Sequence, residues 1–160
     1  MTSNEVKKYI NEVAFSGAEE FLEKYKDKDN AKDSGIIGHF GLGFYSAFMV
    51  AEKVEIITKS HKKASATHWT CDGSPEYTLN KTDKKERGTE IILHVAEDST
   101  EFLEEPRIRE LLNKYNKFMP FPIKFGTKEE TLPLPKDAKK DAKPETQTVD
   151  NIINNIHPAW

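Results

Sequence analysis

Hydrophobic and polar positions along the first part of the chain predict three helices. Apolar residues recur at helical spacing over residues 6–13 and again over 21–25. Each run follows four residues with the pattern of a capping box, Thr2-Ser3-Asn4-Glu5 and Ser16-Gly17-Ala18-Glu19. Residues 44–51 contain no glycine, proline or charge, and they predict a third, buried helix.

The centre of the chain predicts an antiparallel sheet and one more helix. Four segments are rich in β-branched and aromatic residues: 54–60, 68–71, 76–79 and 89–95. Short turns between them favour an antiparallel meander. Pro106 occupies a first helical position, and a short edge strand is predicted over 121–125. Because helices and strands come in separate runs, we predict an α+β fold, a two-layer sandwich with helices on one face of a mainly antiparallel sheet.

The final part of the chain is polar. Residues 126–148 are dominated by Lys, Asp, Glu, Pro and Thr, a composition typical of an extended, solvated linker. Apolar residues return over 149–160, and we expect this segment to be the entry to a further domain.

Length and composition indicate a soluble domain. A chain of 160 residues suits one domain, and a formal net charge of −3 argues against nucleic acid as a main partner. The single cysteine, Cys71, cannot form an internal disulfide, and no apolar run approaches membrane-spanning length. We therefore expect a cytoplasmic protein without a membrane partner. The histidines lack the spacing of metal ligands, so we predict no metal-binding residue.

A glycine-rich loop is the strongest candidate for chemistry. Gly38-His39-Phe40-Gly41-Leu42-Gly43 leads directly into the helix predicted over 44–51. Main-chain N–H groups at the start of a helix are unpaired, so a loop that lacks side chains there lets an anion such as phosphate approach. The spacing matches neither a P-loop nor a dinucleotide fingerprint. On spacing alone, a turn that only lets the helix pack closely is an equal alternative.

Several motifs in order along the chain resemble one family. They are Ala14-Phe15-Ser16-Gly17, the glycine loop with Phe44-Tyr45-Ser46, Arg87-Gly88-Thr89-Glu90-Ile91, and His157-Pro158-Ala159-Trp160. Together they resemble the N-terminal ATPase domain of the heat-shock protein 90 chaperones, in particular the bacterial form. The resemblance implies a Bergerat-type fold, with residues 1–125 as the C-terminal portion of the ATP-binding domain and a lid over about 10–42.

The same resemblance implies a function and its partners. It predicts part of the nucleotide-binding domain of an ATP-dependent molecular chaperone, with ATP and Mg²⁺ as cofactors in the full-length protein. Unfolded or partly folded client proteins would be its partners, and the full-length protein would form a homodimer.

Site residues follow from the resemblance one by one. Four consecutive residues would bring main-chain N–H groups to the phosphates: Gly41, Leu42, Gly43 and Phe44. Thr89 resembles the threonine that helps to hold the adenine, and Met1 resembles the methionine that lines the adenine pocket. Phe15 stands where many members have a lysine near the nucleotide, and here we favour a role in lid packing.

The resemblance also leaves gaps. The family's general-base glutamate, magnesium-ligating asparagine and adenine-binding aspartate precede the part that matches, so we assign no catalytic residue and expect this chain alone to be inactive as an ATPase. A non-catalytic binding or regulatory module that keeps the fold without nucleotide is the alternative. A DNA-repair or topoisomerase relative with the same ATPase fold is less favoured, because Phe44-Tyr45-Ser46 matches the chaperone branch.

Overall fold

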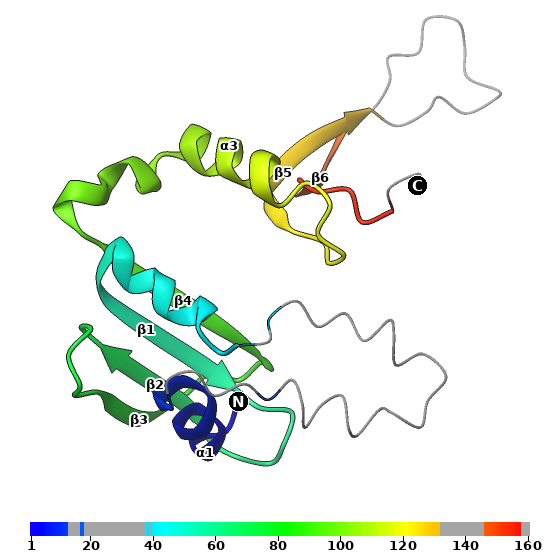
Figure 1. Ribbon diagram of the computed structural model, residues 1–160. Helices are drawn as coiled ribbons and strands as arrows, with labels where there is room; N and C mark the ends of the chain where they lie inside the picture. The colour runs from blue at the N-terminus through cyan, green and yellow to red at the C-terminus, as the bar shows by residue number, and fades with distance from the viewer. Residues whose placement is uncertain (13–16, 18–37, 39, 132–145, 158–160) are drawn as a thin grey trace, which may run out of the picture. The chain divides into compact units, whose positions relative to one another are not determined.

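The computed structural model describes residues 1–12, 17, 38, 40–131 and 146–157 (Figure 1). The chain forms two compact units, Met1–Glu101 and Phe102–Trp160. The helix predicted over 16–25 and most of the predicted lid lie outside the described residues. No helix in the described part of the chain has an apolar stretch long enough to span a bilayer.

The first unit is built on a four-stranded antiparallel sheet. Its strands are β1 (Ala51–Lys59), β2 (Ala66–Cys71), β3 (Thr78–Thr82) and β4 (Gly88–Val95). The spatial order is β3-β2-β1-β4, and all pairs are antiparallel. The predicted strands are confirmed, but the predicted meander is only partly right. β4 does not pair with β3; it pairs with the free side of β1. The most buried strand, β1, therefore has a partner on both sides.

The first predicted helix is confirmed together with its cap. α1 (Ser3–Val6) continues as η1 (Lys7–Asn11), one turn of π-helix. The Thr2 hydroxyl accepts a hydrogen bond from the Glu5 N–H at 3.3 Å, and the Glu5 carboxylate accepts one from the Thr2 N–H at 2.7 Å. This reciprocal pair satisfies two N–H groups that have no partner inside the helix.

The helix after the glycine loop differs from its prediction. η3 (Gly43–Met49) is a 3-10 helix, and β1 already begins at Ala51. Phe44, Ala47 and Phe48 pack against the core, whereas the Met49 side chain is 82% exposed. The prediction of a buried helix was therefore wrong. Residues three apart line up along a 3-10 helix, so a short apolar run can bury one face and leave the other in solvent.

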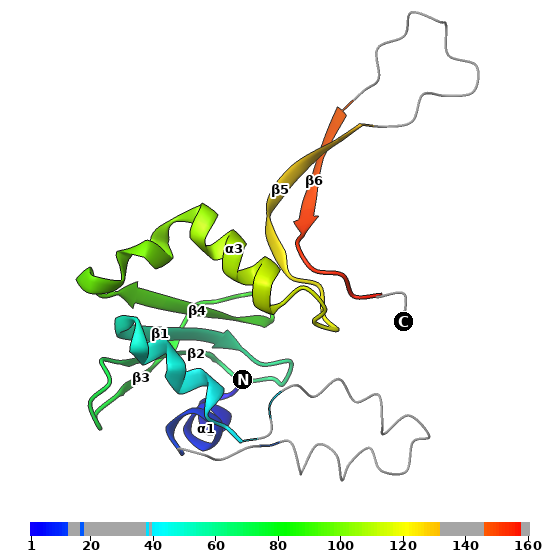
Figure 2. The same cartoon turned by 45° about the horizontal axis from the view of Figure 1, so that its top comes forward.

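One face of the sheet carries the core of this unit. Val54 and Ile56 of β1 alternate with outward residues and are almost completely buried, and Trp69 lies opposite Ile56 on β2. Val6 from α1 joins the same cluster, and Phe44 from η3 packs against it. Helices therefore cover one face of an antiparallel sheet, and the predicted two-layer α+β sandwich is confirmed (Figure 2).

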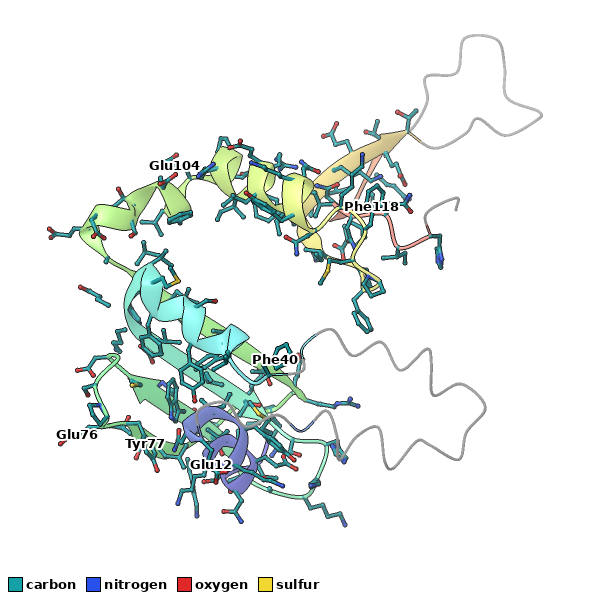
Figure 3. The ribbon with its side chains drawn as sticks, viewed as in Figure 1. Glu12, Phe40, Glu76, Tyr77, Glu104 and Phe118 are labelled. Atoms are coloured by element: carbon teal, nitrogen blue, oxygen red, sulfur yellow. The ribbon has the colours of Figure 1, made fainter. Side chains whose placement is uncertain are left out.

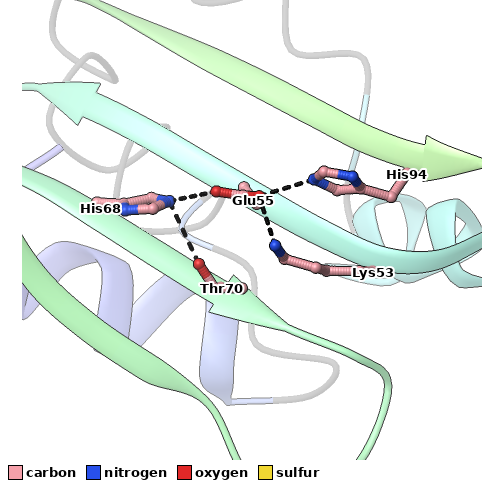
Figure 4. A network of polar contacts seen from close by, with 5 residues as sticks. All are labelled: Lys53, Glu55, His68, Thr70 and His94. Atoms are coloured by element: carbon pink, nitrogen blue, oxygen red, sulfur yellow. Dashed lines mark hydrogen bonds and ion pairs between the residues drawn. The ribbon is translucent and has the colours of Figure 1, made fainter.

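The opposite face of the sheet carries a polar network centred on Glu55 (Figure 4). The Glu55 carboxylate contacts the Lys53 ammonium at 2.8 Å, His68 Nε2 at 2.5 Å and His94 Nε2 at 2.7 Å. The bond from Lys53, followed by those from His94 and His68, lowers the pKa of Glu55 to about 2. Three neighbouring strands are thus tied together through one ionised carboxylate.

Replacing this carboxylate, as Glu55→Gln, should make the unit less sensitive to acid. The folded-state pKa of Glu55 is about 2, below the reference value of 4.5, so its stabilisation is present above pH 4.5 and lost as the pH falls toward 2. Urea unfolding followed by circular dichroism at several pH values measures this. The difference in unfolding free energy between wild type and variant should shrink as the pH falls through that window, because Glu55 becomes protonated. The other carboxylates titrate in both proteins, so their effect cancels in the difference. A difference that stays constant with pH would contradict the assignment.

The second unit consists of a helix and a hairpin. η4 (Glu97–Leu103) leads into it, followed by α3 (Glu105–Tyr115), β5 (Lys124–Thr131) and β6 (Thr146–Ile152). Pro106 lies in the first turn of α3, as expected. The side chain of Asn154 donates to the carbonyls of Met119 and Phe121 and accepts from the Ile123 N–H, which ties the loop before β5 to the end of the chain.

The segment predicted as a linker is structured at both ends. The predicted edge strand over 121–125 overlaps β5 only at its last two residues, and β5 continues to Thr131. β6 begins at Thr146 and pairs antiparallel with β5. A solvated linker over all of 126–148 was therefore wrong. Lys124 pairs with Asp150 across the hairpin at 2.6 Å, so alternating charge that suggests a linker can also stabilise an exposed antiparallel pair.

Candidate functional site

The glycine loop leaves bare main chain at the start of η3. Gly41 has φ +66°, a left-handed conformation that glycine adopts without the strain of a side chain. In the described part of the chain, no side chain caps η3, and a Cβ added to Gly43 would meet no atom of another element within 4 Å. Leu42 lies between them with its side chain 52% exposed. The N–H groups of this turn are therefore open to an approaching anion.

The ring of Phe44, whose main chain is predicted to meet the phosphates, packs against the core. The ring makes edge-to-face contacts with Trp69 and Tyr45, both with centroids 5.7 Å apart, and with Phe48 at 6.4 Å. These contacts fix the first turn of η3 against the core. The packing of the Phe44 side chain thus fixes the position of the glycine loop relative to the core.

A chain of hydrogen-bonding groups joins the two residues predicted to meet adenine. Thr58 of β1 is fully buried, and its hydroxyl accepts a hydrogen bond from the Met1 nitrogen at 2.6 Å. The same hydroxyl lies 2.8 Å from the hydroxyl of Thr89 on β4. The resemblance predicts that Thr89 helps to hold the adenine and that Met1 lines the adenine pocket. In the structure, both residues contact Thr58, which sequence reasoning missed.

The glycine loop and this threonine pair lie at the same end of the sheet. Thr58 lies near the end of β1 and pairs with Thr89 near the start of β4. Figures 1 and 2 both show the start of η3 and the N-terminus of the chain beside that end of β1. Residues far apart in sequence therefore form one candidate site with a main-chain part and a hydroxyl part.

A separate cavity has a volume of about 470 Å³. Its wall combines the end of η1, the side of η3 and the β2–β3 hairpin, which carries Tyr77, labelled in Figure 3. The lining is mainly apolar and aromatic: Ile10, Asn11, Tyr45, Phe48, Trp69, Cys71, Gly73, Ser74, Pro75 and Tyr77. None of the predicted site residues that the structure describes belongs to this cavity.

Two hydrogen bonds close one side of this cavity. The Tyr45 hydroxyl donates to the Ile10 carbonyl at 2.5 Å, and Trp69 Nε1 donates to Asn11 Oδ1 at 2.8 Å. Because an indole N–H can only donate, this bond fixes which amide atom of Asn11 is the oxygen. Asn11 Nδ2 is buried and has no hydrogen-bond partner among the described residues. The amide oxygen is therefore paired, whereas the two N–H donors of the amide nitrogen are not.

One signal in the sequence points to part of this arrangement. A buried indole needs a hydrogen-bond acceptor, and that requirement predicts a polar partner for Trp69. The partner, Asn11, is 58 residues away and cannot be found from local pattern. Phe15 and His39 lie outside the described residues. Among the described residues, no three His, Cys, Asp or Glu side chains are arranged to bind a metal ion.

Comparison with known proteins decides which family this is. No protein-family model matches the chain. The chaperone protein HtpG of Bacteroides thetaiotaomicron is 58% identical over 161 residues, which covers the whole chain. HtpG of Porphyromonas gingivalis is 55% identical over the same length, and an endoplasmin homologue of Dictyostelium discoideum is 40% identical over 91% of the chain.

This chain belongs to the HtpG family, within the heat-shock protein 90 chaperones. It spans about a fifth of the length of the curated relatives it matches, 22% of the B. thetaiotaomicron protein. HtpG chaperones are in general ATP-dependent. The α+β sandwich of the first unit is consistent with the N-terminal domain of an HtpG protein.

Proposed function

We propose that this chain forms part of the nucleotide-binding domain of an ATP-dependent chaperone that assists the folding of client proteins. The observation that carries the proposal is the placement of two groups at one end of the sheet. Open main chain at Gly41–Gly43 lies at the same end as the hydroxyl pair of Thr58 and Thr89. A nucleotide needs both kinds of contact, one for its phosphates and one for its base.

The phosphate side of the proposed site uses the N–H groups of the glycine loop. A left-handed Gly41 and an unobstructed Gly43 leave room for oxygen atoms to approach the main chain. ATP and Mg²⁺ are the proposed cofactors, and ATP supplies the phosphoanhydride bond whose hydrolysis drives a chaperone cycle. No magnesium ligand is assigned to this chain.

The adenine side of the proposed site uses three hydrogen-bonding groups in series: the Met1 nitrogen, the Thr58 hydroxyl and the Thr89 hydroxyl. The Thr58 hydroxyl accepts from the Met1 nitrogen and has one hydrogen to donate. The Thr89 oxygen at 2.8 Å is a nearer acceptor than the Gly88 carbonyl at 3.4 Å. If Thr58 donates to Thr89, the Thr89 hydroxyl hydrogen is available to a ligand. Thr58 would then orient Thr89, and Met1 would line the pocket.

Residues for hydrolysis are proposed to come from a preceding segment of a longer protein. These would be the general base, the magnesium ligand and the carboxylate that recognises adenine. Residues 1–125 would form the later portion of the ATP-binding domain, and residues 149–160 would lead into a further domain. We also propose a cytoplasmic location, unfolded or partly folded clients as partners, and a homodimer for the full-length protein.

One observation favours a second candidate, a binding or regulatory module without nucleotide. The cavity of about 470 Å³ has a size typical of ligand pockets, but its described lining contains no predicted nucleotide-binding residue. In this alternative, the fold would be kept and the glycine loop would serve only to pack η3.

A nuclear magnetic resonance titration of the 160-residue chain separates the two candidates. Addition of ATP with Mg²⁺ should shift the amide signals of Gly41–Phe44 and of Thr89, with weak affinity because only part of the site is present. Adenosine, which lacks phosphates, is the control and should leave the glycine-loop signals in place. Shifts confined to residues that line the cavity, or no shifts at all, would contradict the proposed nucleotide site.

A further inference from the structure

Two threonine hydroxyls on the base side of the proposed site differ in their access to solvent. Thr58 on β1 is fully buried, whereas Thr89 on β4 is exposed. The two residues are directly paired in the sheet, and their hydroxyl oxygens lie 2.8 Å apart. A ligand can therefore reach the Thr89 hydroxyl but not the Thr58 hydroxyl.

The partners of the Thr58 hydroxyl decide where its hydrogen points. The Met1 nitrogen donates to Thr58 Oγ1 at 2.6 Å, so this bond uses a lone pair of the oxygen and leaves the hydrogen for another partner. Among the described residues, the acceptors within reach are the Thr89 oxygen at 2.8 Å and the Gly88 carbonyl at 3.4 Å. A buried hydroxyl needs an acceptor, and only the shorter contact has the usual length of an O–H···O bond. This geometry favours donation from Thr58 to Thr89.

The direction of this bond sets what Thr89 offers to a ligand. When the Thr89 oxygen accepts from Thr58, the Thr89 hydrogen has to point to a different group, and the exposed side of the residue is where a ligand would meet it. In the reverse direction, Thr89 would donate to Thr58 and would offer a ligand only lone pairs. The buried threonine thus determines whether the exposed one is a donor or an acceptor.

We propose that Thr58 is a positioning residue, which holds the Thr89 hydroxyl as a hydrogen-bond donor and makes this part of the site select a ligand group that accepts a hydrogen bond. In adenine, such groups are the ring nitrogens that carry no hydrogen. Thr58 acts through Thr89 and does not touch the ligand. The inference rests on the proposed nucleotide site, and it adds the feature of the base that is recognised and the residue pair that recognises it.

A series of deaza analogues of ATP tests whether Thr89 donates. Each analogue has one ring nitrogen of the base replaced by C–H, which removes a single acceptor. The host is the B. thetaiotaomicron chaperone with its matching stretch replaced by this chain, where the Met1 nitrogen becomes a peptide N–H and still donates. By calorimetry, one analogue should bind about fivefold more weakly than ATP, the effect of one lost hydrogen bond. In Thr89→Val this analogue and ATP should bind equally well.

Variants of Thr58 separate positioning from a structural role. Thr58→Val keeps the shape of the side chain but removes the hydroxyl, so Thr89 is free to turn, and the ratio between the two affinities should at least halve. Thr58→Ser keeps the hydroxyl and should keep the ratio. The matched control is Thr67→Val, a buried threonine opposite Thr58 on β2, which should also keep it. A purely structural role of Thr58 would weaken ATP and the analogue alike and leave the ratio unchanged.

The outcomes distinguish this inference from the proposed function. A ratio that survives in Thr89→Val or in Thr58→Val, with the fold verified by circular dichroism, would overturn the positioning role while the nucleotide site stands. Because Thr89 is exposed, its variant tests the donor direction even where a Thr58 variant does not fold. An unsubstituted chimaera that binds neither ATP nor any analogue would instead contradict the proposed nucleotide site, and this inference with it.

Discussion

Replacing Trp69 by alanine should destabilise the first unit by about 3–5 kcal/mol, as measured by urea unfolding. Trp69 is 4% exposed, and it packs on Phe44 at the base of the glycine loop. Its removal leaves a cavity in a small core and takes away the indole N–H that satisfies Asn11. The same change should therefore loosen both η1 and η3.

Two variants separate the packing of Trp69 from its hydrogen bond. Trp69→Phe keeps an aromatic ring against Phe44 but removes the donor to Asn11, and we expect it to cost less than the alanine variant. Asn11→Ala removes the acceptor and the unpaired Nδ2 together. A Trp69→Ala variant as stable as wild type would show that the aromatic cluster does not hold the core together.

Replacing Gly43 by valine should weaken nucleotide binding more than tenfold, a loss of about 1.4 kcal/mol or more, with little change in fold stability. A Cβ at Gly43 would meet no atom of the other described elements within 4 Å, and Gly43 does not have a positive φ, so we expect the fold to accept a side chain there. The valine methyl groups would instead occupy the space through which phosphate approaches the main chain. The effect on binding should thus be separate from any effect on stability.

This substitution is best measured in a complete domain. The matching stretch of the B. thetaiotaomicron chaperone, which is 58% identical, can be replaced by this chain, and ATP affinity measured by calorimetry. Met49→Val is the matched control, because Met49 lies on the same helix and is 82% exposed at its far end. Equal affinities for the two variants would show that the glycine loop does not contact phosphate.

The capping box and the strands of the first unit could be predicted from the sequence, because each depends on residues close together in the chain. The cap at Thr2 and Glu5 depends on groups three residues apart, and it forms as predicted. The strands follow from runs of β-branched residues, which fit a half-buried pleated surface. The type of η3 was not predictable, because apolar spacing alone does not separate a short 3-10 helix from an α-helix.

Features that depend on distant pairing could not be predicted. β4 lies beside β1 because of register between segments about 35 residues apart, and turn lengths alone favour the meander instead. The sequence predicts Thr58 only as part of a strand. The hydrogen bonds of its hydroxyl with Met1 and Thr89 depend on three segments that are distant in sequence. The two ends of the predicted linker form β5 and β6, and each is a strand because it pairs with the other.

The most direct test of the central claim is whether this chain completes a nucleotide site in a longer relative. The chimaera with the B. thetaiotaomicron chaperone should bind ATP with Mg²⁺ in a saturable, one-to-one manner, with the parent chaperone measured alongside as the reference. Such binding is the result our account predicts. A folded chimaera that fails to bind ATP, while the parent binds it, would contradict the claim that this chain carries part of the nucleotide site.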